Sequence, residues 1–276
     1  MGRRSGERGS FVELEELVLL RDADGAPAGG TPRSRQAASG QFRRTRVTEA
    51  NQRTVLLVVD QRLCMFFGSA AVTKSAFAAR VAALVAWRTV IQGGRVGALI
   101  AGEHRHWSLP PAASSAEVMG LLEQLVEAGR TLDGCRPASG DPFRAALDAV
   151  AEQRHERALV LIISDLRGFS EHAVSTLGRL RQHNDLLLGW VIDPLEIALP
   201  DAPPPLSEGL GDGSWPASDA ALRNALTTAF EQERARVRQL SLKLAAPYRQ
   251  LRTDRPLLEQ LRSSQEFTSV SVGRAG

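Results

Sequence analysis

Cysteine, long apolar runs and a surplus of one charge are all scarce in this chain of 276 residues. The two cysteines, Cys64 and Cys135, are too few for a disulfide scaffold or a zinc ribbon. With 34 basic and 31 acidic residues, the chain also lacks the basic surplus of a general nucleic-acid binder. These absences leave the class of globular proteins with one substantial core.

Segments that could enter a membrane are missing as well. The most apolar helical segment, residues 76–87, contains Arg80 and is too short to span a bilayer. An export signal is not indicated, because Glu15 and Glu16 interrupt the apolar residues 14–20. We therefore expect a cytoplasmic protein.

Apolar runs and helical segments alternate through the middle of the chain. The runs predict strands buried on both faces, at residues 54–60, 95–101, 158–164 and 185–192. Between and after them, we expect helices over residues 73–92, from 114 or 115 to about 128, 142–153 and 170–183. This alternation is typical of an α/β fold with a doubly wound, mainly parallel sheet flanked by helices.

Composition divides the chain into three parts. Residues 1–52 are expected to hold a short helix, residues 11–20, and a basic arm rich in Gly and Pro. Residues 53–200 form the predicted α/β domain. Residues 201–276 read as an extension that packs on this domain: a loop or hairpin, a long helix to residue 244, a short strand over 247–251 and a helix over 256–261.

Three aspartates fall where ligands bind in such sheets, beyond the carboxyl ends of the strands. Asp60 ends the first predicted strand, Asp165 follows the third, and Asp141 precedes a helix that starts near the same edge. Converging carboxylates would favour Mg²⁺ or Mn²⁺, and a magnesium-dependent enzyme acting on a phosphate-containing ligand would use all three. The other interpretation is that they only cap loop and helix amides, which the residue types alone favour.

Several segments resemble a known family. Residues 56–69, 74–75, 82–87 and 94–97 look like the von Willebrand factor A-like proteins of domain-of-unknown-function family fifty-eight, with weaker likeness at residues 14–17, 38–41, 164–165 and 251–254. The resemblance implies a bacterial adaptor that works with a MoxR-type AAA ATPase in a chaperone-like assembly and has no chemistry of its own. Residues 22–39 depart from it, because the family's aromatic, Pro-Gly-Asp-Asp and Ile-Asp-Trp motifs are absent there.

The metal-ion-dependent adhesion site of the wider fold is altered as well. It consists of Asp-x-Ser-x-Ser on a first loop, a threonine on a second and an aspartate on a third. By resemblance, Asp60 is kept, Arg62 and Cys64 replace the two serines, Asp141 stands in place of the threonine, and Asp165 matches the last aspartate. Two hydroxyl ligands are thus lost from the site.

Arginine brings a fixed positive charge and a planar fork of donors suited to carboxylates. We therefore expect Arg62 to take the place of the cation, neutralising Asp60 together with Asp141 or Asp165, and no cofactor to be needed. An acidic group of a partner protein could then meet Arg62 directly. In the alternative, Arg62 points to solvent and the three aspartates hold Mg²⁺. Expected partner contacts on these loops are Phe66, Phe67, Ser69 and Arg167.

Other chemistry finds little support. Cys64 lacks a histidine at a motif-defining spacing and reads as a small filler of its loop. His104 and His106 are expected in a loop after the second strand. Neither a Gly-x-x-x-x-Gly-Lys-Ser/Thr phosphate loop nor a Gly-x-Ser-x-Gly motif occurs. The arginines of residues 33–46 leave nucleic-acid binding as a weaker hypothesis, and the sequence favours a protein-interaction module without catalysis.

Overall fold

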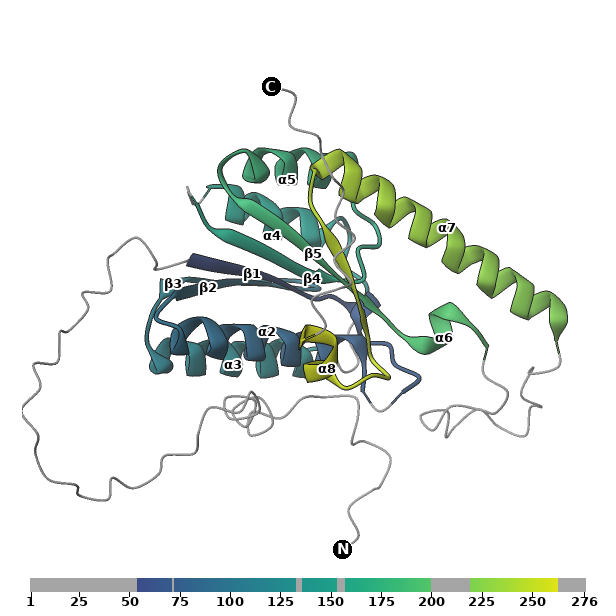
Figure 1. Cartoon of the computed structure of the whole chain (residues 1–276), viewed down its shortest axis with the longest axis horizontal. Coiled ribbons are helices and arrows are strands. Elements are labelled where there is room, and N and C mark those ends of the chain that lie inside the picture. Colours follow the sequence, from purple (N-terminus) through teal and green to yellow (C-terminus); the bar gives the residue numbers. More distant parts are fainter. Residues whose placement is uncertain (1–53, 71, 133–135, 153–156, 200–218, 263–276) are drawn as a thin grey trace, which may run out of the picture.

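The computed structural model describes residues 54–70, 72–132, 136–152, 157–199 and 219–262. They form a six-stranded sheet in the order β3-β2-β1-β4-β5-β6 with helices on both faces (Figure 1). Its centre comprises β1 (Thr54–Gln61), β2 (Arg95–Gly102), β4 (Leu159–Ser164) and β5 (Asp185–Ile192), all mutually parallel where they pair. The expected doubly wound, mainly parallel α/β fold is confirmed.

One strand was not predicted. β3 (His106–Ala112) pairs antiparallel with β2 at the edge of the sheet. The expected loop is therefore wrong for His106, which begins this strand. Its half-exposed, alternating side chains lack the apolar run of the central strands, and Pro110 and Pro111 discourage a strand assignment. An edge strand accepts prolines because one side of it needs no hydrogen-bond donors.

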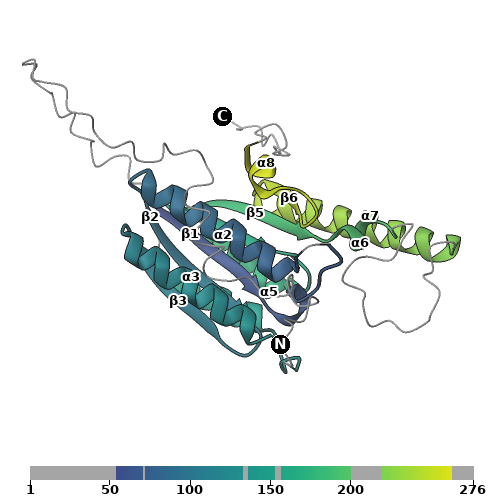
Figure 2. The ribbon, with the colours of Figure 1, turned by 90° about the horizontal axis from the view of Figure 1, so that it is seen from below.

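Two cores fill the space between the sheet and its helices. Alternate residues of β1, including Leu57, pack toward α2 (Lys74–Ile91) and α3 (Ser115–Arg130), and those between them, including Val58, toward α4 (Pro142–Glu152) and α5 (Glu171–His183). Figure 2 shows α2 and α3 side by side across one face. Central strands covered on both faces explain why continuous apolar runs identified them in the sequence.

The C-terminal elements join the same sheet. β6 (Tyr248–Arg252) pairs parallel with β5, after α7 (Ala220–Leu244), and α8 (Leu257–Arg262) follows it. A short helix, α6 (Pro194–Ile197), begins directly after β5 and was not predicted. The predicted helix at residues 11–20, the arginine arm and Cys135 lie outside the described residues. Among the helices of the described part, none is long and apolar enough to cross a membrane.

Candidate functional site at the carboxyl edge of the sheet

The site lies where the strand order reverses. From β1 the chain proceeds outward to β2 and β3, and then returns to β4 on the other side of β1. The carboxyl ends of β1 and β4 are therefore adjacent, and the loops that follow them diverge. Such a switch point is the usual ligand position in an open α/β sheet. Asp60, the next-to-last residue of β1, and Asp165, directly after β4, lie at this point.

Asp60 is completely buried and held by a buried arginine. Nε of Arg62 donates to Oδ1 of Asp60 at 2.9 Å, and Nη2 of Arg62 donates to Oδ2 at 2.8 Å. The backbone N–H of Arg62 adds a bond to Oδ1 at 3.1 Å, and the Ser164 hydroxyl donates to Oδ2 at 2.6 Å. Both oxygens of Asp60 are thus occupied by protein donors, in the bidentate geometry that suits arginine.

Arg62 itself is 8% exposed, with its guanidinium 4.7 Å from the centre of the Phe143 ring. Burial alone would lower the pKa of Arg62, but the charge and hydrogen bonds of Asp60, with a further contribution from the charge of Asp165, raise the pKa overall. Arg62 therefore does not point to solvent, and it stays charged. Because its fork already faces Asp60, it is also not the arginine that could meet an acidic group of a partner.

A second buried cation holds Asp165. Lys74, the first residue of α2, is 1% exposed, and its Nζ lies 3.0 Å from Oδ2 of Asp165 and 2.9 Å from Oε1 of Glu196. Burial would lower the pKa of Lys74, but these two carboxylates raise it. Sequence reasoning gave Lys74 no role. The available signal was a lysine at the start of a mostly apolar helix.

Arg167 completes this cluster from the outside. Its backbone N–H donates to Oδ1 of Asp165 at 3.0 Å, and its Nη2 lies 3.2 Å from Oε1 of Glu196. Its side chain is 52% exposed, in contrast to those of Lys74 and Asp165. Glu196 therefore bridges a buried cation and an exposed one.

Asp141 does not join these carboxylates. It precedes α4, where its Oδ1 accepts from the backbone N–H of Arg144 at 3.0 Å and its Oδ2 from the Ser170 hydroxyl at 3.3 Å. The expectation that Arg62 neutralises Asp60 together with Asp141 or Asp165 is corrected accordingly. Arg62 pairs with Asp60, Lys74 pairs with Asp165, and Asp141 caps a helix.

The donor set does not fit a hard divalent cation. In the described part of the chain, ligand atoms of Asp60, Cys64 and Asp165 lie within 4.8 Å of one another. However, the carboxylate oxygens already accept from Arg62, Lys74 and Ser164, and a thiol replaces a preferred oxygen ligand. Two fixed positive charges in contact with the carboxylates would also repel an incoming cation.

Cys64 is exposed, yet its surroundings disfavour the reactive thiolate form of its side chain. Partial burial of the thiol, and then the negative charges of Asp60 and Asp165, raise the pKa of Cys64 to about 12. A free thiol has a pKa of about 8.5, so far less reactive thiolate is present at neutral pH. This opposes both metal ligation and nucleophilic catalysis by Cys64.

In a Cys135→Ser variant, we therefore expect iodoacetamide to alkylate Cys64 roughly 10- to 100-fold more slowly at pH 8 than a peptide spanning residues 60–68. The lower thiolate fraction slows the reaction, and the greater nucleophilicity of a basic thiolate offsets part of this effect. Mass spectrometry measures the alkylation rate. For the protein, this rate should continue to increase as the pH is raised beyond 10. Equal rates for protein and peptide at pH 8 would contradict the account.

The expected partner contacts differ in accessibility. Phe67 is 40% exposed and Phe66 is half-buried. Ser69 is buried, and both its N–H, at 2.9 Å, and its hydroxyl donate to the carboxylate of Asp193. Ser69 is therefore not placed at the surface, as a partner contact would have to be. It instead ties the loop after β1 to the end of β5.

Asp193 is the anchor of that tie and was missed in the sequence. It is completely buried, accepts from the Thr253 hydroxyl at 3.1 Å, and caps α6 in a reciprocal capping box with Glu196. An aspartate followed by proline and, three residues later, by glutamate was the available signal. The capping box holds the side chain of Glu196 in place, and Glu196 in turn accepts a hydrogen bond from Lys74 Nζ.

Fold and site together define a doubly wound α/β protein whose strand-end carboxylates are paired with internal cations. The family model described as "Protein of unknown function DUF58" matches residues 35–237. The chain belongs to this family, as the resemblance of the sequence had led us to expect.

Relatives and solved structures add the following similarities. "Uncharacterized protein Rv1480" of Mycobacterium tuberculosis and "Uncharacterized protein Mb1516" of Mycobacterium bovis are each 28% identical over 207 residues, or 74% of this chain. The chain spans 64% of the length of these relatives. The conserved hypothetical protein BatB from Bacteroides thetaiotaomicron is 12% identical, with 76% of this chain and 94% of that one covered and a TM-score of 0.44. The SpRpn10 VWA domain is 8% identical, with 76% and 93% covered and a TM-score of 0.35.

Proposed function

We propose that this protein is a non-enzymatic interaction module whose binding surface is the carboxyl edge of the sheet. The observation that carries this proposal is the pair of buried ion pairs, Arg62 with Asp60 and Lys74 with Asp165. They supply internally the positive charge that a metal-ion-dependent adhesion site takes from its ion. The edge is thus a degenerate adhesion site, preassembled by the protein's own cations.

The surface above these pairs offers an aromatic ring and an exposed guanidinium. Phe67 is 40% exposed, and Lys74 Nζ lies 5.9 Å from the centre of its ring on the buried side. The Arg167 side chain is 52% exposed and can leave Glu196, because Lys74 Nζ still donates to that carboxylate at 2.9 Å. A carboxylate of the partner would then replace Glu196 at Arg167, and one charge-assisted contact is exchanged for another.

The partner we propose is a MoxR-type AAA ATPase or its substrate protein. Support for it comes from the family resemblance of residues 56–69, and the chemistry of the edge calls for an acidic group beside an apolar one on the partner. Arg167 takes the role that the sequence had given to Arg62.

Replacement of Arg167 by glutamate should weaken binding to the MoxR-type ATPase of the same genome by at least about tenfold, because a partner carboxylate would meet a like charge. Phe67→Ala should cost a similar factor through lost apolar contact. Biolayer interferometry with immobilised ATPase measures both effects. Arg238→Glu on the exposed face of α7 is the matched control and should change affinity less than twofold. Equal losses for Arg167 and Arg238 would exclude this edge as the binding surface.

The competing hypothesis, a magnesium-dependent enzyme, requires carboxylates free to bind an ion. Both acidic side chains at the switch point instead accept hydrogen bonds from buried cations. Turnover of a phosphate-containing compound that depends on Mg²⁺ and vanishes in Asp60→Asn would establish the enzyme and overturn the interaction module.

A further inference from the structure

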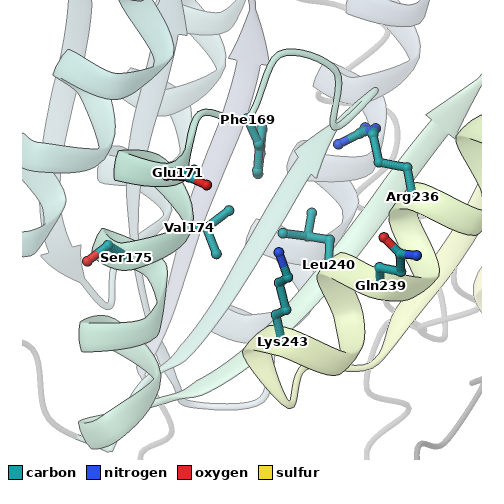
Figure 3. Close-up of a pocket in the computed structure, with 8 residues that line it drawn as sticks. All are labelled: Phe169, Glu171, Val174, Ser175, Arg236, Gln239, Leu240 and Lys243. Carbon is teal, nitrogen blue, oxygen red and sulfur yellow. The ribbon is translucent and has the colours of Figure 1, made fainter.

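A groove of about 420 Å³ lies between α5 and the C-terminal third of α7, beside the loop that follows β4. Figure 3 shows Val174 of α5 and Leu240 of α7 reaching toward each other, with Phe169 at one end. Phe169 is itself fixed, because its ring stacks on that of Phe143 with centroids 4.8 Å apart. The groove therefore has an apolar floor between two helices.

The two walls differ in charge. The α7 wall presents Arg236, Gln239 and Lys243, whose spacing of three and four residues places them on one helix face. The α5 wall presents Glu171 and Ser175. An acidic ligand is thus attracted to Lys243 on the α7 wall and repelled by Glu171 on the α5 wall, which favours one orientation of the ligand in the groove.

The two cations of the α7 wall have different roles. Arg236 is held in place: its Nε donates to Glu233 at 2.9 Å and its Nη2 to the carbonyl oxygen of Leu166 at 2.5 Å. Lys243 is exposed and forms no ion pair with any of the residues that the structure describes. Its ammonium extends over the groove beside Leu240 (Figure 3). Lys243 is accordingly the group available to an acidic ligand.

We infer that this groove docks a short segment of a protein partner in which a bulky aliphatic side chain lies next to a carboxylate. The aliphatic group would cover Val174 and Leu240, and the carboxylate would pair with Lys243 in a contact strengthened by partial desolvation. This second docking surface borders the loop after β4, but it shares no lining residue with the proposed contacts Phe67 and Arg167 and does not require that the edge binds anything.

The probe is a fluorescein-labelled peptide with one leucine between two aspartates. Its two counterparts carry lysines in place of the aspartates or glycine in place of the leucine. Polarisation measures binding to the full chain, and methyl NMR of Val174 and Leu240 detects contacts of millimolar affinity. The acidic leucine peptide should bind saturably and shift both methyl signals, and each counterpart should bind at least about tenfold more weakly.

Lys243→Glu should weaken binding of the acidic peptide at least about tenfold. Arg238→Glu, which reverses a charge on the same helix outside the groove, should change its affinity less than twofold. Thermal melting verifies that both variants are folded. Phe67→Ala should leave peptide binding unchanged, so failure of the groove and failure of the sheet edge are told apart. Equal losses at both α7 positions, equal binding of the lysine peptide, or no methyl shift at millimolar peptide would overturn the inference.

Discussion

Replacing Lys74 by methionine is expected to lower the free energy of unfolding by about 3–5 kcal/mol. The substitution keeps an unbranched side chain of similar length but removes the ammonium group, whose Nζ lies 3.0 Å from Asp165 and 2.9 Å from Glu196. Asp165 is 2% exposed, so its carboxylate would be left buried and without its cation. Urea denaturation followed by circular dichroism measures the change.

The chain contains one other lysine, Lys243, which is exposed and provides the matched control. Lys243→Met should alter stability by less than about 0.5 kcal/mol, since no buried partner loses its charge. Restoring charge balance in Lys74→Met with Asp165→Leu should recover part of the loss, because an apolar pair can replace a buried ion pair. If Lys74→Met and Lys243→Met had the same small effect, the buried pair would not be contributing to the fold.

A comparable loss, about 3–5 kcal/mol, is expected for Arg62→Met. The change leaves Asp60, which is completely buried, with hydrogen bonds from Ser164 and a backbone N–H but without a cation. Denaturant unfolding again measures it. The size of the effect should come from burial rather than from the number of hydrogen bonds lost.

A second bidentate pair tests that distinction. Arg252 and Asp254 are two residues apart, as Asp60 and Arg62 are, and make nearly the same contacts, with Nε donating at 2.9 Å and Nη2 at 2.7 Å. Their side chains are 26% and 32% exposed, however, so water screens the pair. Arg252→Met should therefore cost less than about 1 kcal/mol. A loss as large as that of Arg62→Met would show that burial is not the deciding factor.

The sequence predicted the fold where physical constraints act locally. A central strand covered on both faces must be apolar along its whole length, and β1, β2, β4 and β5 were recognisable for this reason. Caps also gave clear signals, since Thr73 and Asp219 accept hydrogen bonds at the starts of α2 and α7. β3 was not predicted, because a half-exposed edge strand has neither a continuous apolar run nor a helix cap.

The site was predicted less completely, because its contacts join distant segments. Asp60 and Asp165 could be placed from strand ends alone, and the local pair of Asp60 with Arg62 follows from two residues of separation. The partnership of Lys74 with Asp165 spans 91 residues, and that with Glu196 spans 122. Only the folded sheet brings these side chains together, so no local pattern could assign them.

Internal cations would give this edge a property that a metal site lacks. An adhesion site that depends on an ion is complete only when the ion is present, whereas Arg62 and Lys74 are part of the chain and stay charged across the physiological pH range. The proposed binding surface would therefore be ready at any Mg²⁺ concentration. This property follows from the proposed function and separates it from metal-dependent adhesion.

Calorimetric titration of Mg²⁺ and Mn²⁺ into the purified protein tests this claim most directly. We expect no saturable heat for the wild-type chain at millimolar metal, and a gain of binding when Arg62→Ser and Cys64→Ser together restore the two hydroxyl ligands. Circular dichroism establishes that the double variant is folded. Saturable wild-type binding with a Kd below about 0.1 mM that is lost in Asp60→Asn would contradict the account and make the edge a metal site.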